Sequence, residues 1–522
     1  MFQDGRRRWS TPASGTRYLT ATTSECWPPP AGRRTRSRSA DRYDERYEGV
    51  VVDGEIRAGI EGSESQSSAA ADVKTRRRRV VVGASVGSAI EYYDFSVYAF
   101  LASTLSVVFF PGESQTAGLL YTFAVFAVAF VLRPVGGILI GHLADRYGRR
   151  PALATAVIGM AVPTALIGVL PGYAAIGVAA PIMLVLLRVI QGLAAGGEVG
   201  GASVYVAEAA PAERRGLYGS TTQIGVYVGT ALGPLVVGLL RLGLTPEQMT
   251  AWGWRIPFLV SVPLSLAAIL YRRRLEESSD FTRAASKSAI SRMPAVEMLR
   301  SHPAAVVRTT ALNLVAFGGY YLTFTYMATY LPQQGLVSTA SAGWAVLMCL
   351  VFAAFGLPAW AAVSDRIGRR PIFIGVCLGF LVLPYPLFLL MSTSFLGAVV
   401  ALLVLGQLQA AINGAQSATF SEMFPPHIRT SGVALGFNIA SLLAGGVSPY
   451  LATWLIDRTG DARSPAYYLM FLAVVSLVFA VTMRETAGKP LPQAELPASP
   501  VVCDEATDET AGSDRREGID PR

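Results

Sequence analysis

The middle of this chain is a series of long apolar runs that carry one charge or none. A helix of about 20 apolar residues is long enough to cross the hydrocarbon core of a bilayer, which is roughly 30 Å thick. Lipid offers no hydrogen-bonding partners, so a spanning segment must satisfy its own backbone, as a helix does. The runs therefore predict an all-α membrane protein that crosses the bilayer many times.

Two similar basic hairpins, GHLADRYGRR at Gly141–Arg150 and VSDRIGRR at Val363–Arg370, divide the apolar region. A second pair of related stretches, ERRGLYGS from Glu213 and HIRTSGVA from His427, follows them at similar offsets. Recurrence at a regular separation indicates an internal repeat, and many membrane proteins that move solutes contain two such halves. We therefore expect twelve transmembrane helices in two pseudo-symmetric six-helix bundles.

The apolar runs give the boundaries of these helices and of the domains. The predicted spans are 80–110, 116–141, 151–170, 175–208, 217–240, 254–271, 308–331, 342–363, 371–391, 396–422, 431–455 and 466–483. The predicted domains are a disordered extension at 1–75, a first bundle at 76–271, a cytoplasmic linker at 272–307, a second bundle at 308–484 and a disordered tail at 485–522. The extension is rich in Arg, Ser, Gly and Pro and shows no apolar periodicity, which is typical of disorder.

Arginines crowd the loops on one side of the predicted spans, whereas the other side offers only Arg241, Arg255, Arg458 and Arg463. Short loops rich in Lys and Arg stay in the cytoplasm. We therefore expect a plasma (inner) membrane protein with both termini cytoplasmic. These arginines account for most of the net charge of +8, so the expected partners are the lipid bilayer and a small-molecule substrate, not nucleic acid. We expect the chain to work as a monomer.

Four ionisable residues fall near the middle of predicted spans: Glu91, Asp94, Arg133 and Arg188. A charge at that depth is unfavourable, so it usually marks a pathway or a coupling site. A carboxyl group in an apolar cavity can load and release a proton, and a guanidinium can bind a carboxylate with two parallel bonds. We expect all four to share one water-filled chamber. The alternative is that they form internal ion pairs that hold spans one, two and four together.

Four further stretches are more specific. They are GASVGSAIEYYDFSVY at Gly83–Tyr98, LRPVGG at Leu132–Gly137, RVIQGLAAGGE at Arg188–Glu198 and WGWRIPF at Trp252–Phe258. With the hairpin, they make residues 78–485 resemble the metabolite:proton symporter family of the major facilitator superfamily, which includes 2-oxoglutarate/dicarboxylate and proline/betaine permeases. The resemblance implies a proton as the coupling ion. Ser279 stands where the family usually has proline, a difference confined to a loop.

Candidate site residues follow from position and chemistry. We predict proton coupling by Glu91 and Asp94, and substrate binding by Arg133, Arg188, Tyr92, Tyr321, Asn413 and Gln416. Tyrosines in spans also line the membrane interface or pack, and that alternative stays open for Tyr321. The predicted gating residues are Asp145, Arg149, Arg150, Asp365, Arg369, Glu208 and Glu422.

The hairpin aspartates have a specific expected role in the gate. Asp145 should bond to a neighbouring arginine and to the amides that open span eleven near Thr430, and Asp365 should be its counterpart in the other half. Such a contact would hold the cytoplasmic side shut while the cavity opens outward. The alternative is that the hairpins only anchor the topology, which their arginines do in any case.

The residues favour secondary active transport. No Walker A motif and no nucleophile–base or metal constellation is present in the sequence, so we expect neither an enzyme nor a cofactor. Two membrane arginines favour proton-coupled uptake of a small organic acid, such as a dicarboxylate or a 2-oxoacid. A zwitterion such as proline or betaine is the main alternative, although the C-terminal tail lacks the heptads of a coiled coil. A third possibility is a receptor that binds a metabolite without moving it.

Overall fold

The computed structural model describes residues 85–112, 114–147, 149–196, 199–273, 302–335, 337–426 and 428–492, together with Gly83 and Arg300. The predicted extension at 1–75 lies outside these residues, as do most of the predicted linker and most of the tail.

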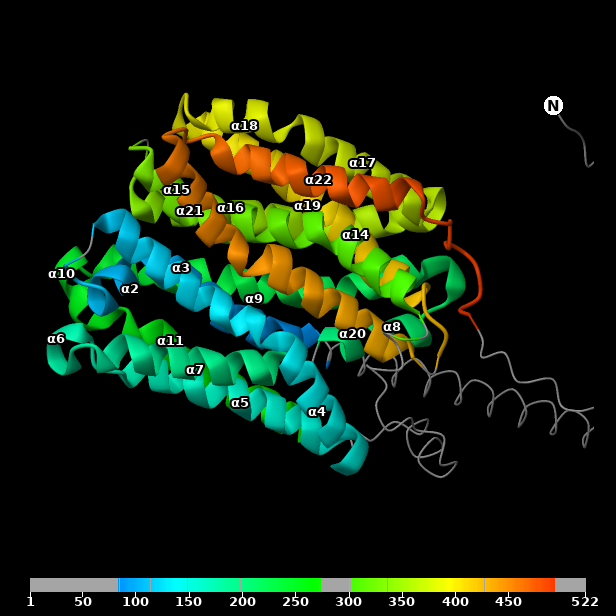
Figure 1. Ribbon diagram of the computed structural model, residues 1–522, viewed down its shortest axis with the longest axis horizontal. Coiled ribbons are helices and arrows are strands. Elements are labelled where there is room, and N and C mark those ends of the chain that lie inside the picture. Colours follow the sequence, from blue (N-terminus) through cyan, green and yellow to red (C-terminus); the bar gives the residue numbers. More distant parts are fainter. Residues whose placement is uncertain are drawn as a thin grey trace, which may run out of the picture. The chain divides into compact units, whose positions relative to one another are not determined.

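The first half consists of helices that follow the predicted spans (Figure 1). The first is Ser85–Phe100, which bends by 63° into α2 (Ala102–Phe109). The others are α3 (Gln115–Val131), α4 (Arg133–Tyr147), α5 (Arg149–Val169), α6 (Tyr173–Ile176), α7 (Ala179–Ala195), α8 (Val199–Ala209), η1 (Ala212–Arg214), α9 (Arg215–Gly243), α10 (Pro246–Gln248), η2 (Met249–Gly253) and α11 (Arg255–Arg273).

The second half repeats this pattern, with two spans interrupted by a single π-helical turn. Its elements are α14 (Pro303–Tyr321), η3 (Leu322–Tyr326), α15 (Met327–Gln333), α16 (Thr339–Ile367), α17 (Arg369–Val382), α18 (Pro384–Met391), α19 (Phe395–Ser421), α20 (Arg429–Ala440), η4 (Ser441–Gly445), α21 (Val447–Thr459) and α22 (Ser464–Val481). The π turns are η3 and η4. Such turns are frequent at functional sites because they free backbone carbonyls.

Within the described residues, six helices are long and apolar enough to cross a membrane, or eight if each of two bent pairs counts as one span. Three shorter apolar helices lie at the third, fourth and sixth predicted spans, at Ala154–Val169, Ala179–Ala195 and Arg255–Ala267. The seventh predicted span is the interrupted run from α14 to α15. The difference from the twelve predicted spans therefore reflects three short apolar helices and one interrupted run, since a helical segment occupies every predicted position.

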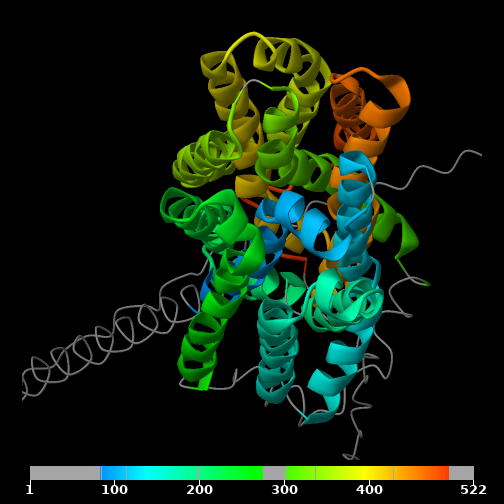
Figure 2. The same cartoon turned by 90° about the vertical axis from the view of Figure 1, so that its left-hand side faces the viewer.

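The two halves pack against each other through a few helices (Figures 1 and 2). Helix α9 contacts α16 and α19, α3 contacts α21, and α20 contacts α4 and α8. Glycines allow some of these close approaches. A Cβ atom on Gly446 would lie 2.2 Å from the ring of Phe130, and one on Gly216 would lie 2.7 Å from Asp365. Small residues at helix interfaces serve this purpose in membrane proteins.

Candidate functional site

Glu91 and Arg133 form an ion pair inside the first half. The Nη2 group of Arg133 donates to Oε1 of Glu91 at 2.8 Å, and both side chains are buried. The Arg133 guanidinium lies over the rings of Phe95 and Phe130, at 4.5 and 4.6 Å from their centroids. Its Nε and Nη1 groups have no hydrogen-bond partner among the described residues. The pair therefore carries no net charge but keeps two N–H groups available to a ligand.

Asp94 lies one turn further along the same helix and makes a different set of contacts. The Thr164 hydroxyl of α5 donates to its Oδ2 atom at 2.8 Å, and the Gln191 amide of α7 donates to the Thr164 hydroxyl at 2.6 Å. The Oδ1 atom of Asp94 has no partner in the described part of the chain. Unlike Glu91, this carboxyl group is held by a neutral hydroxyl.

Arg188 completes the set of charged residues. Its guanidinium lies 3.7 Å from the ring centroid of Tyr98 and 5.9 Å from that of Phe95. Among the described residues no carboxylate oxygen lies within salt-bridge distance of it, and its Nε and Nη2 groups are unpaired. Both guanidiniums lie near the Phe95 ring, Glu91 pairs with Arg133 and Arg188 attracts the Asp94 charge, so the four groups form one buried cluster.

An aromatic cluster joins the two halves next to this charged group. The ring of Tyr320 meets those of Tyr92, Tyr227 and Phe324 edge-on, at 5.9, 5.7 and 5.1 Å between centroids. Tyr321 contacts Phe126 and Phe130 of the first half in the same way, at 6.0 and 5.2 Å. The predicted residues Tyr92 and Tyr321 thus belong to one aromatic layer between α14 and the first half.

Asn413 and Gln416 of α19 also reach the first half. The Asn413 amide donates to the Tyr227 hydroxyl at 2.9 Å, and the Gln223 amide donates to Gln416 at 3.0 Å. Gln416 in turn donates to Asn313 of α14 at 2.5 Å. These polar bonds connect α9, α19 and α14, so the two amides lie between the halves and not towards lipid.

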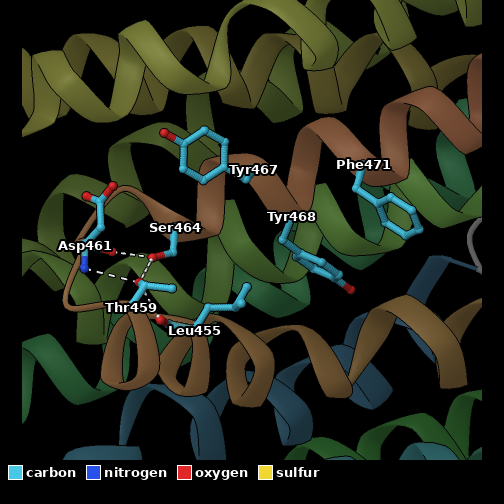
Figure 3. Close-up of a pocket in the computed structure, with 7 residues that line it drawn as sticks. All are labelled: Leu455, Thr459, Asp461, Ser464, Tyr467, Tyr468 and Phe471. Carbon is cyan, nitrogen blue, oxygen red and sulfur yellow. Dashed lines mark hydrogen bonds between the residues drawn. The ribbon is translucent and has the colours of Figure 1, made fainter.

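All eight residues predicted for coupling and binding are 5% exposed or less. None of them lines either of two cavities elsewhere in the structure. The cavity in Figure 3 has a volume of about 320 Å³ and lies between α21 and α22. Its lining residues are Leu455, Thr459, Asp461, Ser464, Tyr467, Tyr468 and Phe471. The other is a groove of about 650 Å³ along α16, α17 and α19. The central residues are therefore shielded from solvent in this structure.

The arginine-rich end of the two halves is joined by ion pairs. Glu422 accepts from Arg215 of the first half at 2.9 Å and from Arg369 at 3.4 Å. Glu208 of the first half accepts from Arg429 of the second at 2.7 Å. Glu208 and Glu422 are 214 residues apart, and so are Arg215 and Arg429. Each acid therefore pairs with the base of the opposite half: Glu422 with Arg215, and Glu208 with Arg429.

Asp365 joins the same end of the halves through backbone amides. Its two carboxylate oxygens accept from the N–H groups of Gly216 and Leu217 at 2.8 and 2.9 Å, and it also pairs with Arg369 at 2.8 Å. These N–H groups open α9, where the helix dipole favours an anion. The expected counterpart of this contact involves Asp145, Arg149 and Arg150, whose side chains lie outside the described residues.

The segment after α22 contributes an acidic cap that sequence reasoning missed. The Glu485 carboxylate accepts from the backbone N–H groups of Arg369 and Arg370, which open α17, and from those of Thr486 and Ala487. Partial burial raises the pKa of Glu485, but these four bonds outweigh it and hold the pKa below its usual value. A carboxylate of this kind stabilises the fold only while it is ionised.

We expect Glu485→Gln to lower the melting temperature at neutral pH, because removing a helix cap costs about 1 kcal/mol. The pKa of Glu485 is lower in the folded chain than in the unfolded chain. Its contribution to stability is therefore complete when the pH is above the pKa of the unfolded chain, and it disappears as the pH falls through the pKa of the folded chain. Melting temperatures of the parent and of Glu485→Gln, measured from neutral to acidic pH, test this expectation. The exposed Glu213→Gln variant is the control, and a difference that persists in acid would contradict the assignment.

Several residues of the site gave no clear signal in the sequence. Thr164, Gln191 and Tyr227 lie in apolar spans, where a single hydroxyl or amide is unremarkable. Arg215 and Arg429 stand in the repeated stretches at equivalent positions, and that repetition was a usable signal. Glu485 is the first acidic residue after the last span, and that position was a weaker sequence signal.

Comparison with known proteins places these features in context. The family model described as "Sugar (and other) transporter" matches residues 80–496. The proline/betaine transporter of Salmonella typhimurium is 37% identical over 434 residues, which is 81% of this chain and 87% of the relative. The ectoine/proline transporter ProP of Corynebacterium glutamicum is 35% identical over 429 residues, which is 79% of this chain and 85% of the relative.

Solved structures match the fold at lower sequence identity. The proton:xylose symporter XylE bound to 6-bromo-6-deoxy-D-glucose has a TM-score of 0.64 at 18% identity, covering 80% of this chain and 98% of that one. The partially occluded inward-open conformation of the xylose transporter XylE from E. coli has a TM-score of 0.63 at 20% identity, covering 80% and 100%.

Proposed function

This chain belongs to the sugar (and other) transporter family of the major facilitator superfamily, and we propose that it takes up a small zwitterionic solute, of the proline or betaine type, together with protons. It is a multi-pass membrane transporter with the major facilitator fold. The observation that carries the choice of substrate is the Glu91–Arg133 ion pair, because it removes one of the two charges that favoured an organic acid.

The charge of the central site is the first argument. Glu91 neutralises Arg133, and an ionised Asp94 balances Arg188, so the four groups together have no net charge. Protonation of Asp94 leaves a single net positive charge. A dicarboxylate would bring two negative charges, one of which would stay unbalanced, and an unpaired buried charge is strongly unfavourable. A zwitterion leaves the net charge of the site unchanged. The charge count therefore argues against a dicarboxylate, whereas the aromatic cluster and the relatives distinguish a zwitterion from a singly charged acid.

The aromatic cluster is the second argument. A substituted ammonium group binds aromatic faces by cation–π attraction, and quaternary ammonium ligands are the best-known case. Tyr92, Tyr227, Tyr320 and Phe324 provide four such rings from both halves. The unpaired N–H groups of Arg133 lie beside this cluster and suit the substrate's carboxylate. The names of the two relatives, a proline/betaine and an ectoine/proline transporter, support the same choice.

The two membrane carboxylates then have separate roles. Glu91 stays ionised as the partner of Arg133 and orients its guanidinium. Asp94 has only a neutral hydrogen-bond donor, so it carries the transported proton. Arg188 attracts the negative charge of ionised Asp94, and this attraction ends when Asp94 binds a proton. We thus assign proton coupling to Asp94 and leave Glu91 with positioning.

Movement follows from the contacts between the halves. The Glu422, Glu208 and Asp365 contacts close the arginine-rich end, which we place in the cytoplasm together with both termini. They must break when the halves rock to release the solute inward. We also propose that a monomer carries out the cycle.

Uptake of radiolabelled betaine, proline, succinate and 2-oxoglutarate into proteoliposomes tests the proposal. With an inward proton gradient, betaine or proline should accumulate, and a protonophore should abolish the accumulation. Concentration of succinate or 2-oxoglutarate instead would establish the organic-acid function. Binding of a solute that never enters the lumen would establish a receptor.

The same assay examines the aromatic cluster. Tyr320→Ala should raise the KM for betaine about tenfold or more, since a desolvated cation–π contact contributes roughly 2 kcal/mol. Tyr320→Phe should stay close to the parent because it keeps the ring and loses only the bond with Thr230. The exposed Tyr467→Ala is a matched control. Equal KM values for the Ala and Phe variants would contradict a role for the ring.

A further inference from the structure

We propose that the Thr164 hydroxyl follows the protonation state of Asp94: it donates to the carboxylate when Asp94 is ionised and turns to the Met160 carbonyl when Asp94 is protonated. This rests on the proton-carrying role of Asp94 given above. Thr164 is a positioning residue, because it acts on transport only through Asp94.

Three polar atoms surround the Thr164 oxygen. It lies 2.8 Å from Oδ2 of Asp94, 2.8 Å from the carbonyl oxygen of Met160, and 2.6 Å from the Nε2 group of Gln191. Gln191 can only donate from this nitrogen, so the Thr164 oxygen accepts one bond in every state. The hydroxyl has a single hydrogen but two acceptors within reach. It must choose between Asp94 and Met160.

The charge on Asp94 decides that choice. A carboxylate is the stronger acceptor, so the hydroxyl donates to an ionised Asp94. When a proton binds Oδ2, that oxygen becomes a donor and needs an acceptor. The Thr164 oxygen has one lone pair left, so it accepts from Asp94 and its own hydrogen rotates to Met160. One proton enters, no covalent bond of Thr164 breaks, and every hydrogen has an acceptor in both states.

The exchange requires no displacement of heavy atoms, since both acceptor distances are already those of a hydrogen bond. It keeps a neutral partner on Oδ2 in the charged and the uncharged form. The Oδ1 atom of Asp94 has no partner among the described residues, so Thr164 is the contact that distinguishes the two forms. A side chain without a hydroxyl could neither donate to the ionised carboxylate nor accept from the protonated one.

Other groups around Asp94 do not replace this contact. From α7, Arg188 attracts its charge, and from its own helix the neighbouring Tyr93 acts on it electrostatically. Helix α5 contributes the uncharged Thr164. Arg188 and Tyr93 remain in every variant below, so a change in the titration of Asp94 reports the hydroxyl.

Infrared difference spectroscopy of the purified full-length protein tests the inference. The carbonyl band of protonated Asp94 is identified by its loss in Asp94→Asn, and its intensity is followed against pH. Thr164→Val removes the hydroxyl from a side chain of the same shape. The midpoint of the Asp94 band should then move to higher pH by about one unit, because the ionised form loses a charge-assisted bond and the protonated form loses a weaker one.

Two further variants separate this effect from general damage. Thr164→Ser keeps the hydroxyl and should titrate like the parent. Thr155→Val is the matched control, because Thr155 lies on the same helix and also donates to the carbonyl four residues before it, at 3.0 Å from Pro151, but makes no hydrogen bond to a carboxylate among the described residues. Its midpoint should be unchanged.

An unshifted midpoint in Thr164→Val, or an equal shift in Thr164→Ser, would overturn the inference. The spectra need no substrate, so they are independent of the uptake assays. If the Asp94 band titrates and responds to Thr164 but no zwitterion accumulates, the proposed substrate is wrong and the inference stands. If Asp94 does not titrate in the parent, its proton role and this inference both fail.

Discussion

Asp94→Asn should abolish accumulation of the solute while preserving its exchange across the membrane. Asparagine cannot bind or release a proton, so a proton gradient no longer does work on the carrier. The binding groups and the Thr164 contact remain, since an amide oxygen still accepts from the hydroxyl. With the gradient present, the internal concentration should therefore rise only to the external one. Proteoliposome uptake and counterflow on the same preparation measure both quantities.

Glu91→Gln is the informative comparison, because the same chemical change is made one turn away. It leaves Arg133 buried without its carboxylate, and breaking a buried ion pair costs about 3–5 kcal/mol. We expect this variant to lose exchange as well as accumulation and to melt at a lower temperature. If Asp94→Asn concentrates the solute like the parent, or if the two variants behave alike, Asp94 is not the separate proton site.

Glu422→Gln should open the arginine-rich end. Glu422 is 2% exposed and bridges Arg215 of one half to Arg369 of the other. Losing its charge disfavours the closed arrangement by part of the roughly 3–5 kcal/mol expected for a buried pair, since Arg369 keeps Asp365 and glutamine still accepts. A residual effect above 1.4 kcal/mol corresponds to a shift of about tenfold or more towards the open form.

Labelling of a buried cysteine measures that shift. Ser417 lies between the halves and bonds to Thr222 at 3.2 Å, so Ser417→Cys, in a protein whose four native cysteines are replaced, reacts with an impermeant maleimide only when this end opens. The exposed Glu213→Gln is the control, because Glu213 belongs to none of the interface ion pairs described above. Equal labelling rates in the two variants would refute the gating role of Glu422.

The central charges show where prediction from the sequence succeeded and where it stopped. Glu91, Asp94, Arg133 and Arg188 stand out because a charge in an apolar run is visible in one dimension. Which acid faces which base is not visible, because it depends on how each helix is rotated about its axis. Two arginines predicted an anionic substrate, and only the structure shows that Glu91 neutralises one of them, Arg133.

The gate shows the same limit. Glu208 and Arg215 lie close in the chain, which suggests a local pair, but each bonds to the opposite half. Thr164 has no pattern that distinguishes it from other hydroxyls in spans. Its importance comes from helices α5 and α7 bringing it, Gln191 and Asp94 together.

Hydropathy and charge along the chain were enough to locate the membrane helices, the repeat and the ionisable residues among them, because exclusion of polar groups from lipid acts on each segment separately. The exchanged ion pairs, the aromatic cluster and the Asp94–Thr164–Gln191 contact depend on packing. Each joins residues from different helices, and side chains meet across an interface only when the distances and rotations of whole helices allow it.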